Sequence, residues 1–178
     1  MDPAARLALA ADINAAARLK GSFKLRSGQV SDEYFDKYRF EADPRLLARM
    51  AAAMTPLVPA GAQVLAGLEL GGVPIATAMS LASGTPAAFV RKKAKDYGTC
   101  LAVEGGSVAG LKVVMIEDVI TTGGAVRDAA RLLEEAGAEV MGVVCAIWRG
   151  EGPPRIEGLE LPVWPALTRD DLNEAGAV

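Results

Sequence analysis

Short runs of apolar residues alternate along the chain with longer segments whose apolar residues recur at helical spacing. The short runs predict buried strands at residues 63–67, 86–90, 113–116 and 139–148. The longer segments predict helices at residues 44–57, 74–83 and 125–137. Strands that alternate with helices favour a mostly parallel central sheet flanked by helices, with right-handed crossovers. The pattern therefore predicts an α/β fold that binds its ligands at the carboxyl ends of the strands.

The two ends of the chain have other patterns. Residues 2–20 have helical spacing and end at a Lys-Gly pair that predicts a helix C-terminus. Residues 22–29 and 33–38 flank a turn and read as a β-hairpin. Residues 152–165 are interrupted by prolines, which predicts an edge of the sheet, and residues 169–174 form a short closing helix.

Composition favours a single domain. The chain has 178 residues, of which 51% are hydrophobic and only 5% aromatic, a balance that suits an α/β core packed by Ala, Val and Leu. We therefore expect one domain, residues 1–178. The net charge of −3 argues against a dedicated nucleic-acid-binding protein, which is usually basic.

The sequence also predicts a cytoplasmic protein. Its apolar runs are too short to span a bilayer, and charged residues interrupt the N-terminal segment where a signal peptide would be apolar. Cys100 and Cys145 are far apart in sequence, and Cys145 lies in an apolar strand, which favours free thiols in a reducing compartment.

The absence of histidine limits the possible chemistry. The chain has no His at all, which removes Ser-His-Asp and Cys-His mechanisms and the usual imidazole zinc sites. Any reaction must use carboxylates, Lys, Arg, Tyr, backbone amides or a hard cation such as Mg²⁺.

The most informative stretch is residues 112–126, a buried strand followed by Glu117, Asp118 and a Thr-Thr-Gly-Gly turn into a helix. Glycines allow backbone N–H groups to converge at a helix N-terminus, which favours a phosphate. The adjacent acids suit the two hydroxyls of a phosphorylated ribose and can stabilise a positive sugar carbon. The alternative is an ordinary turn with solvated acids. Walker A and dinucleotide-binding fingerprints are absent.

Two further loops fit a phosphorylated ligand. Residues 68–74 place Gly71 and Gly72 between a strand and a helix, which is a second possible anion cradle. A tight turn without a ligand is the alternative reading. Residues 91–95 carry four positive charges on an otherwise acidic chain, which suggests a local polyanion site. The alternative interpretations of this cationic run are a solvated surface and a patch that binds nucleic acid.

Three stretches resemble known enzymes. Residues 113–126 resemble the phosphoribosyl pyrophosphate motif of type I phosphoribosyltransferases. The run Phe-Val-Arg-Lys-Lys-Ala-Lys-Asp-Tyr-Gly at 89–98, followed by Glu-Gly-Gly at 104–106, resembles the mobile catalytic loop of orotate phosphoribosyltransferases. Phe-Lys-Leu-Arg-Ser-Gly at 23–28 with Tyr-Phe-Asp at 34–36 resembles the N-terminal hood of that family. The resemblance implies the type I phosphoribosyltransferase fold, with a small hood formed mainly by about residues 20–40.

The resemblance also implies an activity. It is the Mg²⁺-dependent transfer of a 5-phosphoribosyl group from phosphoribosyl pyrophosphate to orotate, giving orotidine 5′-monophosphate and pyrophosphate in de novo pyrimidine biosynthesis. Mg²⁺ would be held mainly by oxygens of the sugar donor, without a dedicated cluster of protein ligands. The family further implies a homodimer in which the loop at residues 91–104 reaches the neighbouring active site.

Site residues follow from the same resemblance. The implied catalytic residues are Arg91, Lys95, Glu117 and Asp118. The residues implied to bind phosphoribosyl pyrophosphate are Leu70, Gly71, Gly72, Arg91, Lys92, Lys95, Tyr97, Glu117, Asp118, Val119, Ile120, Thr121, Thr122, Gly123, Gly124 and Ala125. Those implied to bind orotate are Arg26, Tyr34, Phe35, Thr121 and Arg149.

Some positions depart from the family or have a plainer reading. Arg26 and Gly71 stand where lysine is common, and Tyr97 replaces a common histidine. The two aromatics at 34 and 35 could serve only as hairpin core, and Arg149 could be a solvated strand-end residue. Rival functions are a purine or uracil phosphoribosyltransferase, a non-catalytic regulator that senses phosphoribosyl pyrophosphate, and a dinucleotide-binding oxidoreductase.

Overall fold

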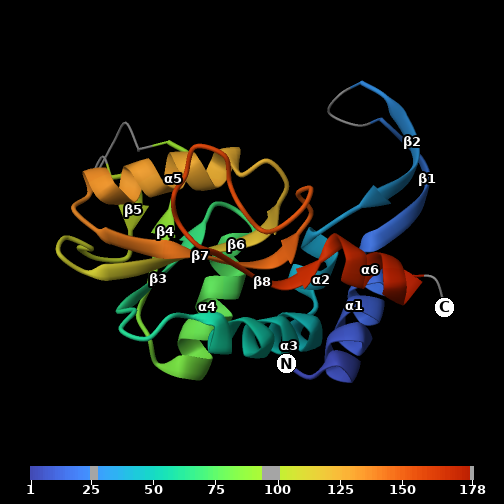
Figure 1. The fold of residues 1–178 in the computed structure, drawn as a ribbon, viewed down its shortest axis with the longest axis horizontal. Helices are drawn as coiled ribbons and strands as arrows, with labels where there is room; N and C mark the ends of the chain where they lie inside the picture. Colours follow the sequence, from blue (N-terminus) through green and yellow to red (C-terminus); the bar gives the residue numbers. More distant parts are fainter. Residues whose placement is uncertain (25–27, 94–100, 177–178) are drawn as a thin grey trace.

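The structure, a computed structural model, describes residues 1–24, 28–93 and 101–176 (Figure 1). The described residues form a six-stranded sheet with the order β5-β4-β3-β6-β7-β8. All neighbouring strands are parallel except β5, which is antiparallel to β4. The strands are β3 (Val64–Leu68), β4 (Ala87–Val90), β5 (Val103–Glu104), β6 (Lys112–Ile120), β7 (Glu139–Trp148) and β8 (Val163–Thr168). The predicted mostly parallel sheet is confirmed.

Helices cover both faces of the sheet, as predicted. Figure 1 shows α5 (Gly124–Glu135) on one face, and α3 (Pro44–Met54) and α4 (Gly72–Ser83) on the other. The inner face of α5 buries residues at helical spacing, namely Val126, Ala129, Ala130 and Leu133. One core lies between α5 and the sheet, and a second joins α1 (Pro3–Ala17), α3 and α4 to the opposite face.

The N-terminal hairpin is confirmed, but it begins earlier than the sequence predicts. Helix α1 ends at Ala17, and Arg18 already starts strand β1 (Arg18–Lys24), which pairs antiparallel with β2 (Val30–Phe35). The predicted helix end at Lys20-Gly21 is therefore wrong. Pairing of Arg18 with Phe35 and of Leu19 with Tyr34 satisfies backbone groups that another helical turn would otherwise use.

Three local features were not predicted from the sequence. A short helix, α2 (Tyr38–Ala42), follows the hairpin, and β5 pairs with β4 although its sequence has no clear period. Strand β6 extends to Ile120, so Glu117 and Asp118 lie inside the strand and not in a following loop. The cap of α3 is as predicted, because Asp43 Oδ1 accepts from the N–H of Arg45 at 2.8 Å.

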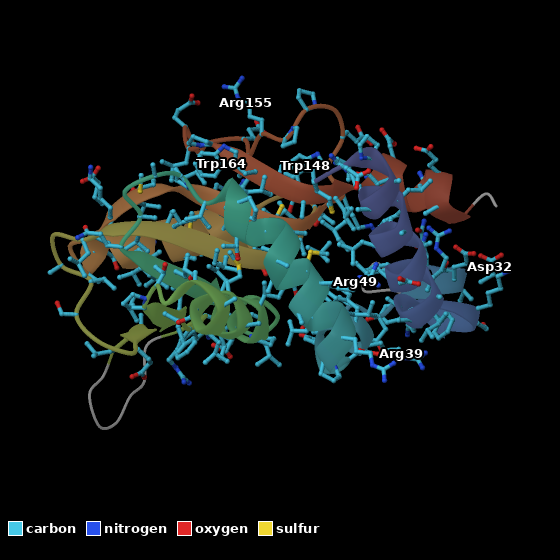
Figure 2. All side chains as sticks on the ribbon, turned by 90° about the horizontal axis from the view of Figure 1, so that it is seen from below. Asp32, Arg39, Arg49, Trp148, Arg155 and Trp164 are labelled. Carbon is cyan, nitrogen blue, oxygen red and sulfur yellow. The ribbon has the colours of Figure 1, made fainter. Side chains whose placement is uncertain are left out.

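Other features agree with the sequence analysis. Cys145 is a free, fully buried thiol in β7. Figure 2 shows Trp148 and Trp164, which come from the neighbouring strands β7 and β8. Within the described ranges, the search for membrane spans finds no helix with enough length and apolar character to cross a bilayer.

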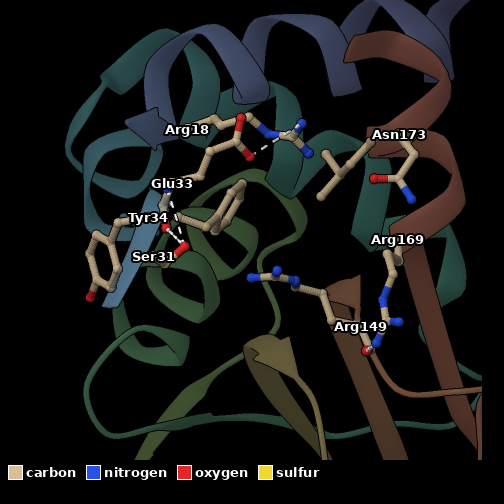
Figure 3. A pocket seen from close by; sticks show the side chains of 9 residues that line it. Arg18, Ser31, Glu33, Tyr34, Arg149, Arg169 and Asn173 are labelled. Atoms are coloured by element: carbon tan, nitrogen blue, oxygen red, sulfur yellow. Dashed lines mark hydrogen bonds and ion pairs between the residues drawn. The ribbon is translucent and has the colours of Figure 1, made fainter. Parts of the chain in front are cut away.

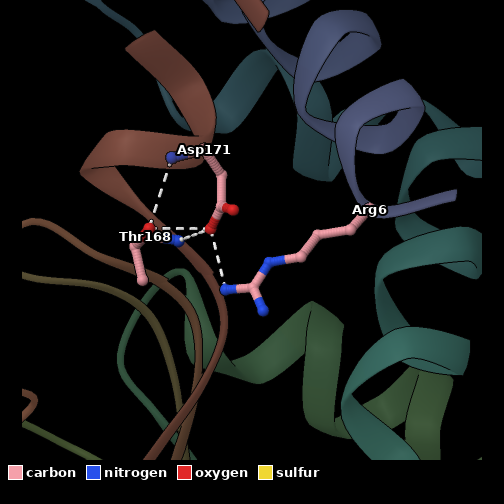
Figure 4. Close-up of polar contacts among 3 residues, drawn as sticks. All are labelled: Arg6, Thr168 and Asp171. Carbon is pink, nitrogen blue, oxygen red and sulfur yellow. Dashed lines mark hydrogen bonds and ion pairs between the residues drawn. The ribbon is translucent and has the colours of Figure 1, made fainter. Parts of the chain in front are cut away.

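The carboxylate of Asp171 in the C-terminal helix α6 (Arg169–Gly176) helps to fix this helix to α1 (Figure 4). Asp171 Oδ2 accepts from the N–H of Thr168 at 2.6 Å and from Nη2 of Arg6 at 2.8 Å. The N–H of Asp171 donates in return to Oγ1 of Thr168 at 3.3 Å, which completes a capping box. Burial acts to raise the pKa of Asp171, but the hydrogen bonds from Arg6 and Thr168 outweigh it and lower the pKa.

We expect Asp171→Ala to lower the free energy of unfolding at pH 7 by about 1–2 kcal/mol, because it removes a helix cap and the partner of Arg6. Asp170→Ala is the matched control, since Asp170 is exposed in the same helical turn. It should change the free energy by less than about 0.5 kcal/mol. Urea unfolding of the three proteins measures the difference, and equal losses in the two variants would contradict the capping role.

Candidate active site

The site is built from the carboxyl ends of parallel strands. Strands β4, β3, β6 and β7 are neighbours and parallel, so their following loops lie along one edge of the sheet. A cavity of about 530 Å³ lies between these loops and α5, and Arg91, Lys92, Gly124 and Ala125 are among the residues that line it. The N–H of Lys92 donates to Oε2 of Glu69 at 2.9 Å, which links the loops after β3 and β4. The structure thus brings two predicted cations to the start of α5.

The turn into α5 has the geometry of an anion cradle. Gly123 adopts φ +75°, and a Cβ there would lie 2.5 Å from Cγ2 of Ile156, so the turn requires glycine. The N-cap residue is Gly123, so no side-chain cap occupies the first N–H groups of α5. These groups have no partner within the helix. Thr121 and Thr122 are exposed beside it. This turn can therefore bind a phosphate through backbone N–H groups.

The two acids of β6 are buried. Glu117 is 7% exposed and Asp118 is 0% exposed. Each folds back onto the main chain: Glu117 Oε1 accepts from the N–H of Asp118 at 2.9 Å, and Asp118 Oδ1 accepts from the N–H of Val119 at 2.5 Å. The second oxygen of Asp118, Oδ2, lies 2.5 Å from Nζ of Lys37, which precedes α2.

These groups divide into one ionised acid and two protonated ones. Burial raises the pKa of Glu117 well above its usual range, and the neighbouring Asp118 raises it further. Burial, followed by the hydrogen bond with Asp118 and then the Asp118 charge, raises the pKa of Glu41 in α2 to about 9. For Asp118 itself burial is outweighed by its hydrogen bonds and by Lys37, so its pKa is lowered. Asp118 and Lys37 therefore form a neutral pair of opposite charges.

The loop after β3 approaches β6 so closely that side chains do not fit. A Cβ at Gly72 would lie 2.2 Å from the carbonyl oxygen of Ile116, and one at Gly71 would lie 1.6 Å from Oδ2 of Asp118. Gly71 begins α4 without a side-chain cap, which leaves backbone N–H groups for a ligand. Leu70, just before it, is 58% exposed.

A second cavity, of about 360 Å³, lies between the hairpin and the C-terminal helix (Figure 3). The guanidinium of Arg149 lies 5.2 Å from the ring centroid of Phe35, and Tyr34 belongs to the same lining. The N–H of Arg149 donates to the carbonyl of Ile120 at 2.8 Å, which ties this cavity to the end of β6. Burial lowers the pKa of Arg149, and the charges of Arg169 and Arg18 lower it further.

Comparison with known proteins identifies the family. The model of the phosphoribosyl transferase domain matches residues 41–164. An orotate phosphoribosyltransferase of Nocardioides sp. (strain ATCC BAA-499 / JS614) is 62% identical over 175 residues, which cover 95% of this chain and 97% of that protein. The chain belongs to the orotate phosphoribosyltransferase family.

Solved structures of orotate phosphoribosyltransferases agree with this assignment. The Mycobacterium tuberculosis H37Rv enzyme has a TM-score of 0.83 and 33% identity, covering 94% of this chain and 98% of that one. The complex of that enzyme with 5-phospho-α-D-ribosyl 1-diphosphate has a TM-score of 0.80 and 31% identity, covering 95% and 99%. The resemblance and the type I phosphoribosyltransferase fold are confirmed, and the oxidoreductase alternative is excluded.

The structure explains one of the positions at which this chain departs from the usual residues of the family, Gly71. Lysine is common in orotate phosphoribosyltransferases where this chain has Gly71, but any side chain there would overlap Asp118 as it lies here. Arg26, Lys95 and Tyr97 lie outside the described residues. Val119 and Ile120 are the last residues of β6, directly before the Thr121 turn.

Sequence reasoning missed several residues that orotate phosphoribosyltransferase chemistry could use. Lys37 and Glu41 flank Asp118, and Arg18, Arg169 and Asn173 line the cavity at Arg149. Their partners are distant in sequence, so no local motif marks them. A weak signal existed for Arg169, which directly follows a strand end as Arg91 and Arg149 also do.

We expect the stability of the protein to fall with rising pH because of Glu41. The pKa of Glu41 is raised from 4.5 to about 9, so the folded chain keeps a proton that the unfolded chain releases. The stabilising contribution is complete below about pH 4.5 and is lost as pH rises toward 9, by at most about 1.4 kcal/mol per pH unit. Glu41→Gln should remove the contribution of Glu41 to this slope and leave that of Glu117, whose pKa is also raised.

Urea unfolding between pH 5 and about pH 9 measures the effect. The free-energy difference between Glu41→Gln and the parent protein should grow in favour of the variant as pH rises. Glu134→Gln, at an exposed position of α5, is the matched control for the change from Glu to Gln. Parallel curves for Glu41→Gln and the parent protein would show that Glu41 is ionised in the folded state.

Proposed function

We propose that the protein is an orotate phosphoribosyltransferase. It transfers the 5-phosphoribosyl group from phosphoribosyl pyrophosphate to orotate and releases pyrophosphate and orotidine 5′-monophosphate, a step of de novo pyrimidine biosynthesis. The observation that carries the proposal is 62% identity to an orotate phosphoribosyltransferase along 95% of the chain. The cradle at α5, the buried acid pair and the cavity beside Arg149 support it.

The sugar donor is assigned to the loops at the strand ends. The 5′-phosphate binds the turn from Thr121 to Ala125, and the ribose hydroxyls bind Glu117 and Asp118. The pyrophosphate binds backbone N–H groups of residues 70–72 and the cations Arg91 and Lys92, which line the cavity beside the start of α5. Lys95 and Tyr97 complete this set by family resemblance. A helix N-terminus and two cations supply the positive field that a pyrophosphate needs.

The reaction needs positioning and electrostatics more than a covalent nucleophile. When the bond from the sugar carbon to pyrophosphate breaks, positive charge develops on the sugar and negative charge on the leaving group. Asp118, held ionised in a buried site, stabilises the first, and Arg91, Lys92 and Lys95 stabilise the second. The pyrimidine nitrogen then adds to the sugar carbon and loses its proton to the leaving pyrophosphate or to water. Exclusion of water protects this carbon from hydrolysis.

Mg²⁺ is the expected cofactor. Within the described residues no group of three or more His, Cys, Asp or Glu side chains could hold a metal ion. The chain instead offers polar partners for a substrate whose own pyrophosphate and hydroxyl oxygens are the hard donors that Mg²⁺ prefers. Bound in this way with the sugar donor, Mg²⁺ would neutralise part of the leaving-group charge. Arg91 and Lys92 would neutralise a further part of the pyrophosphate charge.

Orotate is assigned to the cavity between the hairpin and Arg149. Orotate is planar and carries a carboxylate. This cavity offers the Phe35 ring as a flat apolar surface and Arg149 as a carboxylate partner, and Tyr34 belongs to the same lining. Arg169 Nη2 donates to the carbonyl of Arg149 and so supports its position. Arg26 and Thr121 complete the proposed set. Uracil lacks the carboxylate and leaves Arg149 unpaired.

Three organisational features belong to the proposal. Residues 1–178 act as one domain in which the hairpin is the hood. The protein works as a homodimer whose loop at 91–104 reaches the neighbouring active site. It acts in the cytoplasm, where its substrates are found. Size-exclusion chromatography with light scattering tests the dimer directly.

We expect purified protein to consume orotate only when phosphoribosyl pyrophosphate and Mg²⁺ are both present. The absorbance of orotate in the ultraviolet follows the reaction, with uracil and adenine as parallel bases. We expect turnover of orotate and at most trace turnover of uracil. Uracil has no carboxylate, so its binding would leave the guanidinium of Arg149 without a partner. Binding of the sugar donor without turnover of any base would identify a regulator on the same fold.

We expect Lys95→Ala to lower turnover by about 100-fold or more, with little change in the free energy of unfolding, because its proposed contact forms in the transition state. Lys93→Ala is the control, since Lys93 is an exposed cation of the same run without a proposed role. Steady-state kinetics on both variants measure the effect. Turnover of Lys95→Ala near that of the parent protein would overturn the loop assignment.

A further inference from the structure

The Lys37 side chain lies at the diol-binding acid although no sequence motif marks it. Lys37 is the residue before α2, directly after the hairpin, and its Nζ is 2.5 Å from Oδ2 of Asp118. Asp118 comes from the middle of the sheet, so the contact joins the end of the hood to the centre of the proposed sugar site. The backbone N–H of Val119 already occupies the other oxygen of Asp118.

Exposure shows which group a ligand meets first. The side chain of Asp118 is 0% exposed, whereas that of Lys37 is 33% exposed. The other acids around Asp118, Glu41 and Glu117, are themselves buried. Because Nζ of Lys37 lies 2.5 Å from Oδ2 of Asp118, a sugar hydroxyl that hydrogen-bonds to this oxygen comes close to the ammonium or displaces it.

Lys37 supplies the positive charge beside Asp118, while hydrogen bonds with Glu117 and from the N–H of Val119 also lower the pKa of Asp118. The titratable groups that face Asp118 are Lys37, Glu41, Glu117 and Cys145, and of these only Lys37 is a cation. A buried carboxylate without a partner of opposite charge takes up a proton. An ionised carboxylate accepts a stronger hydrogen bond from a hydroxyl than a neutral acid does.

We propose that Lys37 is a sugar-donor-binding residue that holds Asp118 ionised for the ribose diol and turns its remaining N–H donors to the donor's oxygens. The inference rests on the proposed function, because the diol is assigned to Asp118 there. An ammonium has three donors on a flexible stem, so Lys37 can keep one hydrogen bond to Asp118 while it contacts the substrate. The hood is thereby coupled to the sugar site through one side chain.

The test compares binding of three sugar donors to three proteins by calorimetry in the presence of Mg²⁺. The donors are phosphoribosyl pyrophosphate and its analogues that lack the 2- or the 3-hydroxyl. The proteins are the parent, Lys37→Met and Arg39→Met. Arg39 is an exposed cation of the same short helix, and Figure 2 shows it at the edge of the molecule. Its substitution removes the same charge without touching Asp118.

We expect Lys37→Met to bind phosphoribosyl pyrophosphate about 10-fold more weakly, and Arg39→Met to bind it as the parent does. The parent should lose about 10-fold in affinity when the hydroxyl that meets Asp118 is absent, and Lys37→Met should lose less than about 3-fold. This thermodynamic cycle isolates the coupling between Lys37 and the hydroxyl. If the parent and Lys37→Met lose the same factor in affinity when the hydroxyl is removed, the proposal is overturned. Removal of a lysine with a merely structural role would weaken binding of the complete donor and of its analogue by the same factor.

Lys37→Arg keeps the result interpretable if Lys37→Met folds poorly. Arginine retains the positive charge, so this variant should keep the sensitivity to the hydroxyl. Loss of that sensitivity in a folded Lys37→Arg protein would also contradict the proposal. The measurement is independent of the base, so failure of orotate turnover would overturn the proposed function while donor binding still tests Lys37.

Discussion

The close approach of α4 to strand β6 is the constraint on which the site depends. Three glycines make it possible: a Cβ at Gly67 would lie 2.7 Å from the carbonyl oxygen of Gly72, one at Gly72 would lie 2.2 Å from that of Ile116, and one at Gly71 would overlap Asp118. Backbone therefore packs on backbone at the carboxyl ends of β3 and β6. The start of α4 lies beside the acid pair only because these positions have no side chains.

Placing carboxyl groups at such a buried point requires a balance of charge. Three acids, Glu41, Glu117 and Asp118, gather there, and full ionisation of all three would be costly. The chain keeps one of them ionised, pairs it with Lys37 and leaves the other two protonated. Gly71 and Lys37 both make the ionised Asp118 possible. The glycine leaves the space that the Asp118 side chain fills, and the lysine neutralises the charge of Asp118.

The sequence predicted the sheet and the loops well because their signals are local. A run such as Val113 to Ile116 can only be a buried strand beside helices, and Gly123 marks a turn that no other residue can make. The extension of β6 through Asp118 was missed because two acids in a row normally end a strand. Tertiary contacts override that expectation: Lys37, from a segment about 80 residues earlier, compensates the charge inside the strand.

Contacts between residues that are distant in sequence also form the proposed orotate cavity. Arg149 was predicted from the resemblance to orotate phosphoribosyltransferases. Its surroundings come from the two ends of the chain: Phe35 and Arg18 from the hairpin, Arg169 from α6. Helix α6 is in turn held to α1 by Asp171 and Arg6. Because Arg169 donates to the carbonyl of Arg149, the position of the proposed orotate-binding arginine depends on how the N- and C-terminal helices pack. The hood motif marks Tyr34 and Phe35 of this cavity, but no motif marks Arg18 or Arg169, since they join the cavity only after the hairpin and α6 have packed beside the sheet.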